Sequence, residues 1–286
     1  MQFSAGRAFT EAFQLLGTRF GMLVGVWLTF FVGILALFAA FGSMFIAAFA
    51  QANIGSGTGP GIGPGRNPFA GMGFSVIVFY VLYLAVLFAQ QIALSRASTG
   101  RAEDSFAVSL GAGLRGALPM LGVMVIYLIA GIGGGVVFTL FAAGLVAATQ
   151  SMGLNFLLGM ALLLGFFYLF ARLSLVLPVV AIDEVRNPIA AIGRAWKLTA
   201  GNSVKVALTW ALALIAITAL YFLVFMITVG FPGPGTLAGG PLQSIGFIVA
   251  MIVMGLSVGL YMVTLTTALY DQLSPSSAEM AAETFA

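Results

Sequence analysis

Few residues in this chain of 286 could do chemistry, and arginine is the commonest type among them. Charged residues make up 7% of the sequence, and the chain contains neither histidine nor cysteine. A histidine general base, a thiolate nucleophile and metal sites built on imidazole or thiolate are therefore excluded. No pair of carboxylates and no serine–base set suggests catalysis. We expect a protein that is not an enzyme and that holds no cofactor or metal.

Arg172 stands out because apolar residues flank it on both sides. A charge at the centre of a membrane helix costs about 2.5–3.5 kcal/mol on insertion scales, so such a residue is a functional candidate. Two interpretations are open. In one, Arg172 reaches the headgroup level and pairs with Asp183 or Glu184, which requires the chain to turn near Pro178. In the other, Arg172 binds a lipid phosphate. Both predict an anionic neighbour.

The elements that must position these residues are long apolar segments. Hydrophobic residues make up 61% of the chain, and stretches of about 20 apolar residues recur, each able to cross a hydrocarbon core. Because backbone polar groups in lipid must be satisfied within their own segment, these segments are helices. The sequence predicts an all-α polytopic membrane helical bundle, a single membrane domain (1–286), with spans at 20–50, 73–95, 117–149, 154–180, 204–229 and 243–270.

Two glycine- and proline-rich stretches, 51–71 and 230–241, cannot hold a helix and are expected to be flexible loops. Residues 274–286 are expected to form a flexible C-terminal tail. Of the 11 Lys and Arg residues, only Arg66 lies on the side of these two loops. Since basic residues concentrate on the cytoplasmic side, we expect a multi-pass protein of the bacterial inner membrane with both termini cytoplasmic.

A short amphipathic phrase recurs before the odd-numbered spans. The chain reads GRAF at residues 6–9 and GRAW at residues 193–196, and a weaker copy contains Phe106 and Leu110. This recurrence predicts three pseudo-repeats, each with an interfacial helix followed by a helical hairpin. The repeats cover about 1–98, 99–182 and 183–273, and their interfacial helices are expected at 3–17, 103–115 and 186–199.

A helix with Phe or Trp on one face and Arg or Lys on the other lies in the plane of the lipid headgroups. Arg7, Arg194 and Lys197 therefore join Arg172 as candidates for binding lipid or another anion. The plainer alternative is that these helices only anchor the spans that follow them. Membrane lipids are the expected partners, a membrane protein partner is left open, and no nucleic-acid partner is expected.

Glycines recur at helical spacing within three of the spans. Gly17, Gly21 and Gly25 form one set, and Gly255 and Gly259 another. Small residues at this spacing favour close packing of membrane helices. The third span contains the run 131–135, which is rich in glycine. That run is compatible with a kink or a tight contact, which we favour, or with the break of a re-entrant element.

Residues 171–202, ARLSLVLPVVAIDEVRNPIAAIGRAWKLTAGN, combine an Arg, an apolar run with Pro178, an acidic Glu184 and a basic amphipathic helix. This stretch resembles the membrane domain attached to some bacterial glycerophosphoryl diester phosphodiesterases, and related six-span inner-membrane proteins. In that family the chemistry belongs to a separate soluble barrel. The resemblance therefore implies the membrane part alone, without the catalytic part.

The sequence supports two hypotheses of function. The first is a non-enzymatic inner-membrane protein that organises lipids or a partner complex through its amphipathic helices. The alternative is a transporter or flippase-like protein for an amphiphilic or anionic substrate, with Arg172 as the anion contact. A lipid-sized cavity that reaches Arg172 would favour the alternative. A proton-coupled transporter is disfavoured because no Asp or Glu lies deep in a span.

Overall fold

The computed structural model describes residues 3–54, 73–99, 105–149, 151–229 and 241–274, and the regular structure of this part is entirely helical. The expected tail beyond Ser274 and most of the loops at 51–71 and 230–241 lie outside the described residues, as does Arg66. Residues 51–54 and Pro241, which the sequence assigned to those loops, are helical. The described residues form eight helices in chain order: α1 Ala5–Ile54, α2 Gly73–Ser98, α3 Phe106–Thr149, α4 Met152–Leu173, α5 Val176–Ile182, α6 Pro188–Leu198, α7 Ser203–Val229 and α8 Pro241–Leu273.

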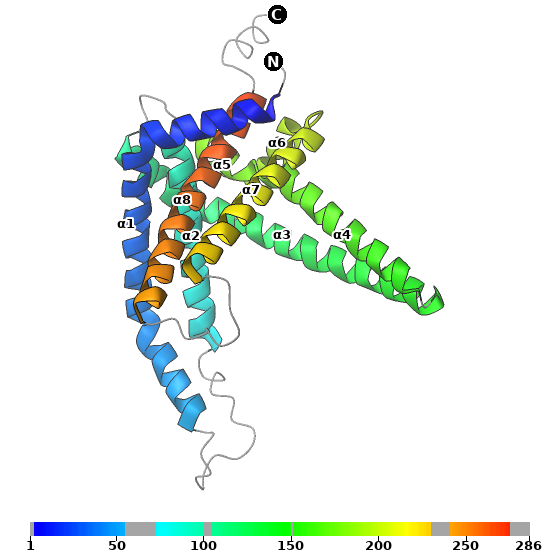
Figure 1. The fold of residues 1–286 in the computed structure, drawn as a ribbon, viewed down its shortest axis with the longest axis horizontal. Coiled ribbons are helices and arrows are strands. Elements are labelled where there is room, and N and C mark those ends of the chain that lie inside the picture. The colour runs from blue at the N-terminus through cyan, green and yellow to red at the C-terminus, as the bar shows by residue number, and fades with distance from the viewer. Residues whose placement is uncertain (1–2, 55–72, 100–104, 150, 230–240, 275–286) are drawn as a thin grey trace, which may run out of the picture.

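Within the part of the chain that the structure describes, six segments are long and apolar enough to cross a membrane: Ala5–Ser43, Phe74–Ser98, Phe106–Thr149, Met152–Ile182, Ser203–Ile227 and Val249–Leu273. The prediction of an all-α polytopic bundle with six spans is thereby confirmed. Two helices, α1 and α3, are longer than their predicted spans because each continues without a break from its amphipathic segment into its apolar one. Figure 1 shows the first turns of α1 lying across the end of the bundle, at a steep angle to the rest of that helix.

The fourth predicted span, 154–180, is two helices instead of one. The chain leaves α4 at Ser174 and enters α5 after Leu175. The physical reason is Pro178, which has no N–H to donate to the carbonyl of Ser174 and lies in the first turn of α5, where that N–H is not needed. The indole N–H of Trp210 on α7 donates to the Ser174 hydroxyl at 3.0 Å and holds the break in place.

The amphipathic segments predicted at 3–17, 103–115 and 186–199 are helical wherever the structure describes them, from Ala5, Phe106 and Pro188 onward. In α6 the Asn187 side chain accepts the N–H groups of Ile189 at 2.9 Å and Ala190 at 3.3 Å, a regular N-cap. Proline at the first helical position suits this start. The internal threefold repeat stays a prediction.

Hydrogen bonds and close contacts bring one end of each span together. Gln272 near the end of α8 accepts the Ser4 N–H at 3.4 Å and donates to Glu11 of α1 at 2.8 Å. The end of α2, the start of α3, and α5 and α6 meet at the same end. We call this the basic end, because every Arg and Lys that the structure describes lies in or beside it: Arg7, Arg19, Arg96, Arg115, Arg172, Arg186, Arg194, Lys197 and Lys205.

Beyond the basic end, the hairpin formed by α3 and α4 diverges from α1, α2 and α8 (Figure 1). In the most apolar stretch of α2, 28% of the residues are buried inside the protein, and in that of α8 the share is 33%. The corresponding share is 6% in α3 and 6% in the segment that joins α4 and α5. The protein core therefore lies near the basic end, and the hairpin presents almost all its side chains outward.

The glycines that permit close helix packing are not those that the sequence suggested. A Cβ placed at Gly17, Gly21 or Gly259 would meet no other atom within 4 Å. The run 131–135 is continuous α-helix, which excludes a re-entrant break, and its glycines also make no close contact. The expectation of tight packing is wrong at these positions. At the two other predicted glycines a Cβ would make only ordinary contacts, at 3.5 Å from Phe106 for Gly25 and 3.9 Å from Tyr221 for Gly255.

The close approaches lie instead in the first part of α3. A Cβ at Gly113 would come within 2.4 Å of the Ala89 carbonyl oxygen on α2. A Cβ at Gly116 would come within 2.7 Å of Ile92, and one at Gly122 within 2.6 Å of Pro188 at the start of α6. These three glycines let α3 rest on α2 and α6 at backbone distance.

Candidate functional site

Two arginines at the basic end close the ends of short helices. Arg96, in the last turn of α2, donates to the carbonyls of Ala181 and Ile182 at 3.3 Å each, where α5 ends. Arg172, in the last turn of α4, donates to the Trp196 carbonyl at 2.8 Å, where α6 ends. The last carbonyls of a helix lack partners within that helix and carry partial negative charge. Each guanidinium satisfies such carbonyls and also joins two helices.

The partners of Arg172 are neutral groups. Its Nε donates to the hydroxyl of Thr199 at 3.2 Å, a second nitrogen donates to Tyr168 at 3.4 Å, and the Arg172 guanidinium carbon lies 3.8 Å from the ring centroid of Trp196. Stacking of a guanidinium on an indole is a favourable cation–π contact. Among the residues that the structure describes, no carboxylate pairs with Arg172, so the expectation of Asp183 or Glu184 as its partner is wrong.

Asp183 is the centre of a separate cluster. Its carboxylate accepts a hydrogen bond from Arg194 on α6 and another from the hydroxyl of Tyr270 on α8. Burial acts to lower the pKa of Arg194, but the hydrogen bond and charge of Asp183 outweigh it and hold that pKa above its ordinary value. The cluster therefore fastens α6 and α8 to the end of α5, and Arg194 is engaged in it.

Glu184 has an unusual backbone conformation, with a φ of 53°. Non-glycine residues rarely adopt this left-handed region, and they do so at a cost of order 1–3 kcal/mol that surrounding contacts must offset. The Glu184 carboxylate lies 3.5 Å from Arg96, so the acid does form an ion pair, but not with Arg172. The reversal of the chain after α5 follows from this conformation.

The candidate residues in the outer layer of the basic end differ in their contacts. Arg7 pairs with Glu11 at 2.6 Å along the surface of α1. Lys197 is exposed, and no hydrogen bond or ion pair joins its side chain to another residue in the described part of the chain. On the same helix, Ile189 is 73% exposed and Trp196 is 41% exposed. The outward side of α6 therefore combines apolar side chains with an available cation.

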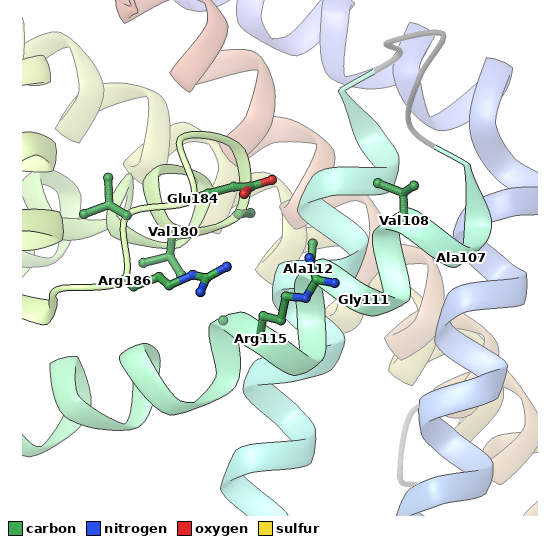
Figure 2. Close-up of a pocket in the computed structure, with 11 residues that line it drawn as sticks. Ala107, Val108, Gly111, Ala112, Arg115, Val180, Glu184 and Arg186 are labelled. Carbon is green, nitrogen blue, oxygen red and sulfur yellow. The ribbon is translucent and has the colours of Figure 1, made fainter.

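A polar pocket of about 310 Å³ lies between the start of α3 and the connection from α5 to α6. Figure 2 shows Arg115 reaching into this space from α3, with Arg186 and Glu184 reaching into it from the connection. Sequence reasoning counted Arg115 as a topology charge and Arg186 as a charge of the amphipathic segment 186–199, because nothing in their local sequence indicates that they face a common space. We call this feature the Arg115–Arg186 pocket.

Two larger grooves on the bundle are apolar. One, of about 690 Å³, lies between α3 and α4 and is lined by Tyr127, Gly131, Phe166 and their neighbours. The other, of about 600 Å³, lies among α1, α7 and α8. The first includes Leu173 and Ser174 in its lining but not Arg172. The groove between α3 and α4 is therefore lined by neighbours of Arg172 but not by Arg172 itself.

The described residues contain no group of three or more acidic side chains that could hold a metal ion. No protein-family model, curated protein or solved structure matches this chain. The fold and the span pattern define the class of protein: a polytopic, all-helical integral membrane protein.

Proposed function

We propose that this membrane protein is not an enzyme and that it organises anionic lipids through the helices at its basic end. In this proposal the protein lies in a bacterial inner membrane with the basic end and both termini cytoplasmic. The resemblance of residues 171–202 to a phosphodiesterase-associated membrane domain is kept as part of the proposal. A membrane protein partner that joins the lipids at this end is compatible with the same surface.

The observation that carries the proposal is the outward side of α6. Ile189 and Trp196 are exposed there next to Lys197, whose ammonium group is available to an anion. An interfacial helix binds a membrane through its apolar area together with attraction between cations and anionic headgroups. Each Lys or Arg near an anionic surface contributes about 1 kcal/mol. The same end also gathers the other described cations, which favours anionic over zwitterionic lipid.

The transporter alternative is supported less well. It requires a cavity that delivers an anion to Arg172, but the Arg172 guanidinium is engaged by α6. The apolar groove beside it is lined by Leu173 and Ser174 and does not include Arg172. A group already bonded to a helix end has few donors left for a substrate. The geometry therefore favours the lipid-organising function.

The test is the lipid content of the protein purified from its own membrane. Mass spectrometry of the co-purifying lipids should show anionic phospholipids enriched over their proportion in the membrane. The double variant Ile189→Ser/Lys197→Gln should lose part of that enrichment, while the conservative control Ile189→Leu/Lys197→Arg should keep it. Equal proportions of each lipid in the protein and in the membrane would refute the proposal.

The orientation has its own test, motivated by the concentration of basic residues at one end. Reporter fusions after Gly61 and after Gly235 should both report the outer side of the membrane, because each position lies in a loop opposite the basic end in the expected topology. A cytoplasmic signal from either fusion would contradict this orientation.

A further inference from the structure

The Arg115–Arg186 pocket differs from the other basic sites of the molecule. Arg7, Arg96, Arg172 and Arg194 each bond an acid or a helix end. In the part of the chain that the structure describes, the side chain of neither Arg115 nor Arg186 makes a hydrogen bond or an ion pair. Both side chains nevertheless line one small pocket (Figure 2). Two like charges that face one space repel each other unless an anion lies between them.

The acid at the pocket does not neutralise both arginines. Glu184 also lines it, but its carboxylate lies 3.5 Å from Arg96, a cation outside the lining. Among the residues that the structure describes, one carboxylate shared with Arg96 does not balance the charge of both Arg115 and Arg186. The pocket is therefore positive and open to an anion of one or two charges.

The positions of the two arginines are fixed by backbone packing. Gly116, the residue after Arg115, lies so close to α2 and α5 that a Cβ there would come within 2.7 Å of Ile92 and 3.3 Å of Val180. Pro188, two residues after Arg186, rests on Gly122 of α3 in the same way. Both contacts hold the backbone next to an arginine, so binding has to order the two exposed side chains but not the chain that carries them.

We propose that the Arg115–Arg186 pocket binds a phosphate group. A planar guanidinium donates two parallel hydrogen bonds to phosphate oxygens, so two arginines suit phosphate better than a halide or a single carboxylate. Ligand pockets commonly occupy about 300–1,000 Å³, so a pocket of about 310 Å³ accepts a phosphate with a small substituent. Two sources can supply such a phosphate: a phospholipid headgroup and free phosphate. Only the headgroup source rests on the proposed function.

The surroundings place the pocket at the level where headgroups lie. Leu114 and Leu118, which belong to the same part of α3 as Arg115, are 69% and 76% exposed. Apolar side chains that are exposed on an amphipathic segment at the basic end face lipid in the proposed orientation. A phosphate bound by Arg115 would then lie at the boundary between the bilayer and the aqueous phase.

Three variants test the pocket in the full-length protein reconstituted in phosphatidylcholine nanodiscs. Arg115→Gln/Arg186→Gln removes both cations. Gly111→Leu fills the pocket without removing a charge, because Gly111 lines it and a Cβ there meets no other atom within 4 Å. Lys205→Gln removes a positive charge at an exposed position outside the pocket lining and away from Ile189 and Lys197, and serves as the control.

Two probes separate the sources of the phosphate: inorganic phosphate added to the nanodiscs, and phosphatidic acid incorporated in them. Calorimetric titration measures the first, and native mass spectrometry of retained lipid measures the second. For the probe that the wild type binds, the arginine variant and Gly111→Leu should each bind at least about tenfold more weakly, as expected for the loss of about 1.4 kcal/mol. The control should lose less than the pocket variants.

Each outcome decides a separate question. Binding of inorganic phosphate identifies a free-phosphate site, whereas retention of phosphatidic acid alone identifies a headgroup site. If both pocket variants match the lysine control, the pocket proposal is overturned, while enrichment of anionic lipid in the wild type would leave the proposed function standing. If the wild type binds neither probe, the pocket proposal fails. If, in addition, the lipids that co-purify with the protein from its own membrane are not enriched in anionic phospholipid, the proposed function fails as well.

Discussion

The basic end and the α3–α4 hairpin are built from the same apolar helices but are held in different ways. At the basic end, side chains bind helix ends, and glycines let backbones touch. The hairpin buries only 6% of the residues in the most apolar stretch of either arm, and its glycines at 131–135 face open space. One region is held by specific contacts within the protein, and the other depends on its surroundings.

This contrast follows from the solvent. In lipid, apolar side chains gain little by moving from a lipid contact to a protein contact, so specific helix packing depends on close backbone approach and hydrogen bonds. Those contacts occur where the chain supplies polar side chains and small residues on facing helices. Arg96, Arg172 and Asp183 at the basic end meet that condition, so positions there should tolerate substitution poorly, and positions in the hairpin should tolerate it well.

The largest effect should come from glycine substitution. Gly113→Val places a side chain against the backbone carbonyl of Ala89, which cannot move without shifting α2. Overpacking typically costs about 1–3 kcal/mol, and a backbone clash lies at or above the upper end. Melting in detergent should show a large loss of stability or of folded yield. Gly133→Val, in open space on the hairpin, is the control and should change little; equal losses would remove the distinction between the two regions.

A smaller loss is expected from Arg172→Gln. The substitution removes hydrogen bonds to the end of α6 and the stacking on Trp196, so we expect a loss of roughly 1–2 kcal/mol in the free energy of unfolding. Arg172→Lys keeps the charge but not the planar fork and should recover only part of it. Lipid retention should stay unchanged. Loss of anionic lipid at unchanged melting temperature would instead identify Arg172 as a headgroup site.

The parts of this fold that the sequence predicts depend on local signals. Six apolar runs predict six spans, and Asn187 followed by Pro188 predicts the start of α6. A proline within an apolar run indicates an irregularity, which occurs at Ser174 and Leu175, a few residues before Pro178. Each of these features is determined by residues within a few positions of one another.

The partners in the site depend on how distant segments meet, so local sequence does not reveal them. The sequence offers Asp183 and Glu184 as the nearest acids to Arg172, yet the fold assigns Arg172 to Thr199 and Asp183 to Tyr270. The glycines illustrate the same limit. Gly113 and Gly133 are both glycines within one helix, and only the arrival of α2 beside Gly113 distinguishes them.

The ion pair of Asp183 and Arg194 should have a moderate effect. Asp183 is 17% exposed and also accepts a hydrogen bond from Tyr270, whereas Arg194 is 44% exposed and partly screened by solvent. A double-mutant cycle with Asp183→Asn and Arg194→Gln should give a coupling of about 0.5–1 kcal/mol. The coupling should change little with salt because the carboxylate is largely buried. No coupling would show that α6 is held at this end by Arg172 alone.

The smallest effect should come from Arg7 and Glu11, which lie at the basic end but outside its interlocked contacts. Their side chains are 62% and 27% exposed, and Arg precedes Glu, the less favourable order for a pair four residues apart. An arginine near a helix start also opposes the helix dipole. Glu11 also accepts a hydrogen bond from Gln272, so the stability lost in Glu11→Gln alone exceeds the contribution of the ion pair.

A double-mutant cycle with Arg7→Gln and Glu11→Gln should therefore give a coupling of at most about 0.5 kcal/mol, which declines as salt screens the charges. A coupling above about 1 kcal/mol that persists at high salt would show that specific contacts also hold the first turns of α1. Those turns would then belong with the tightly held part of the basic end.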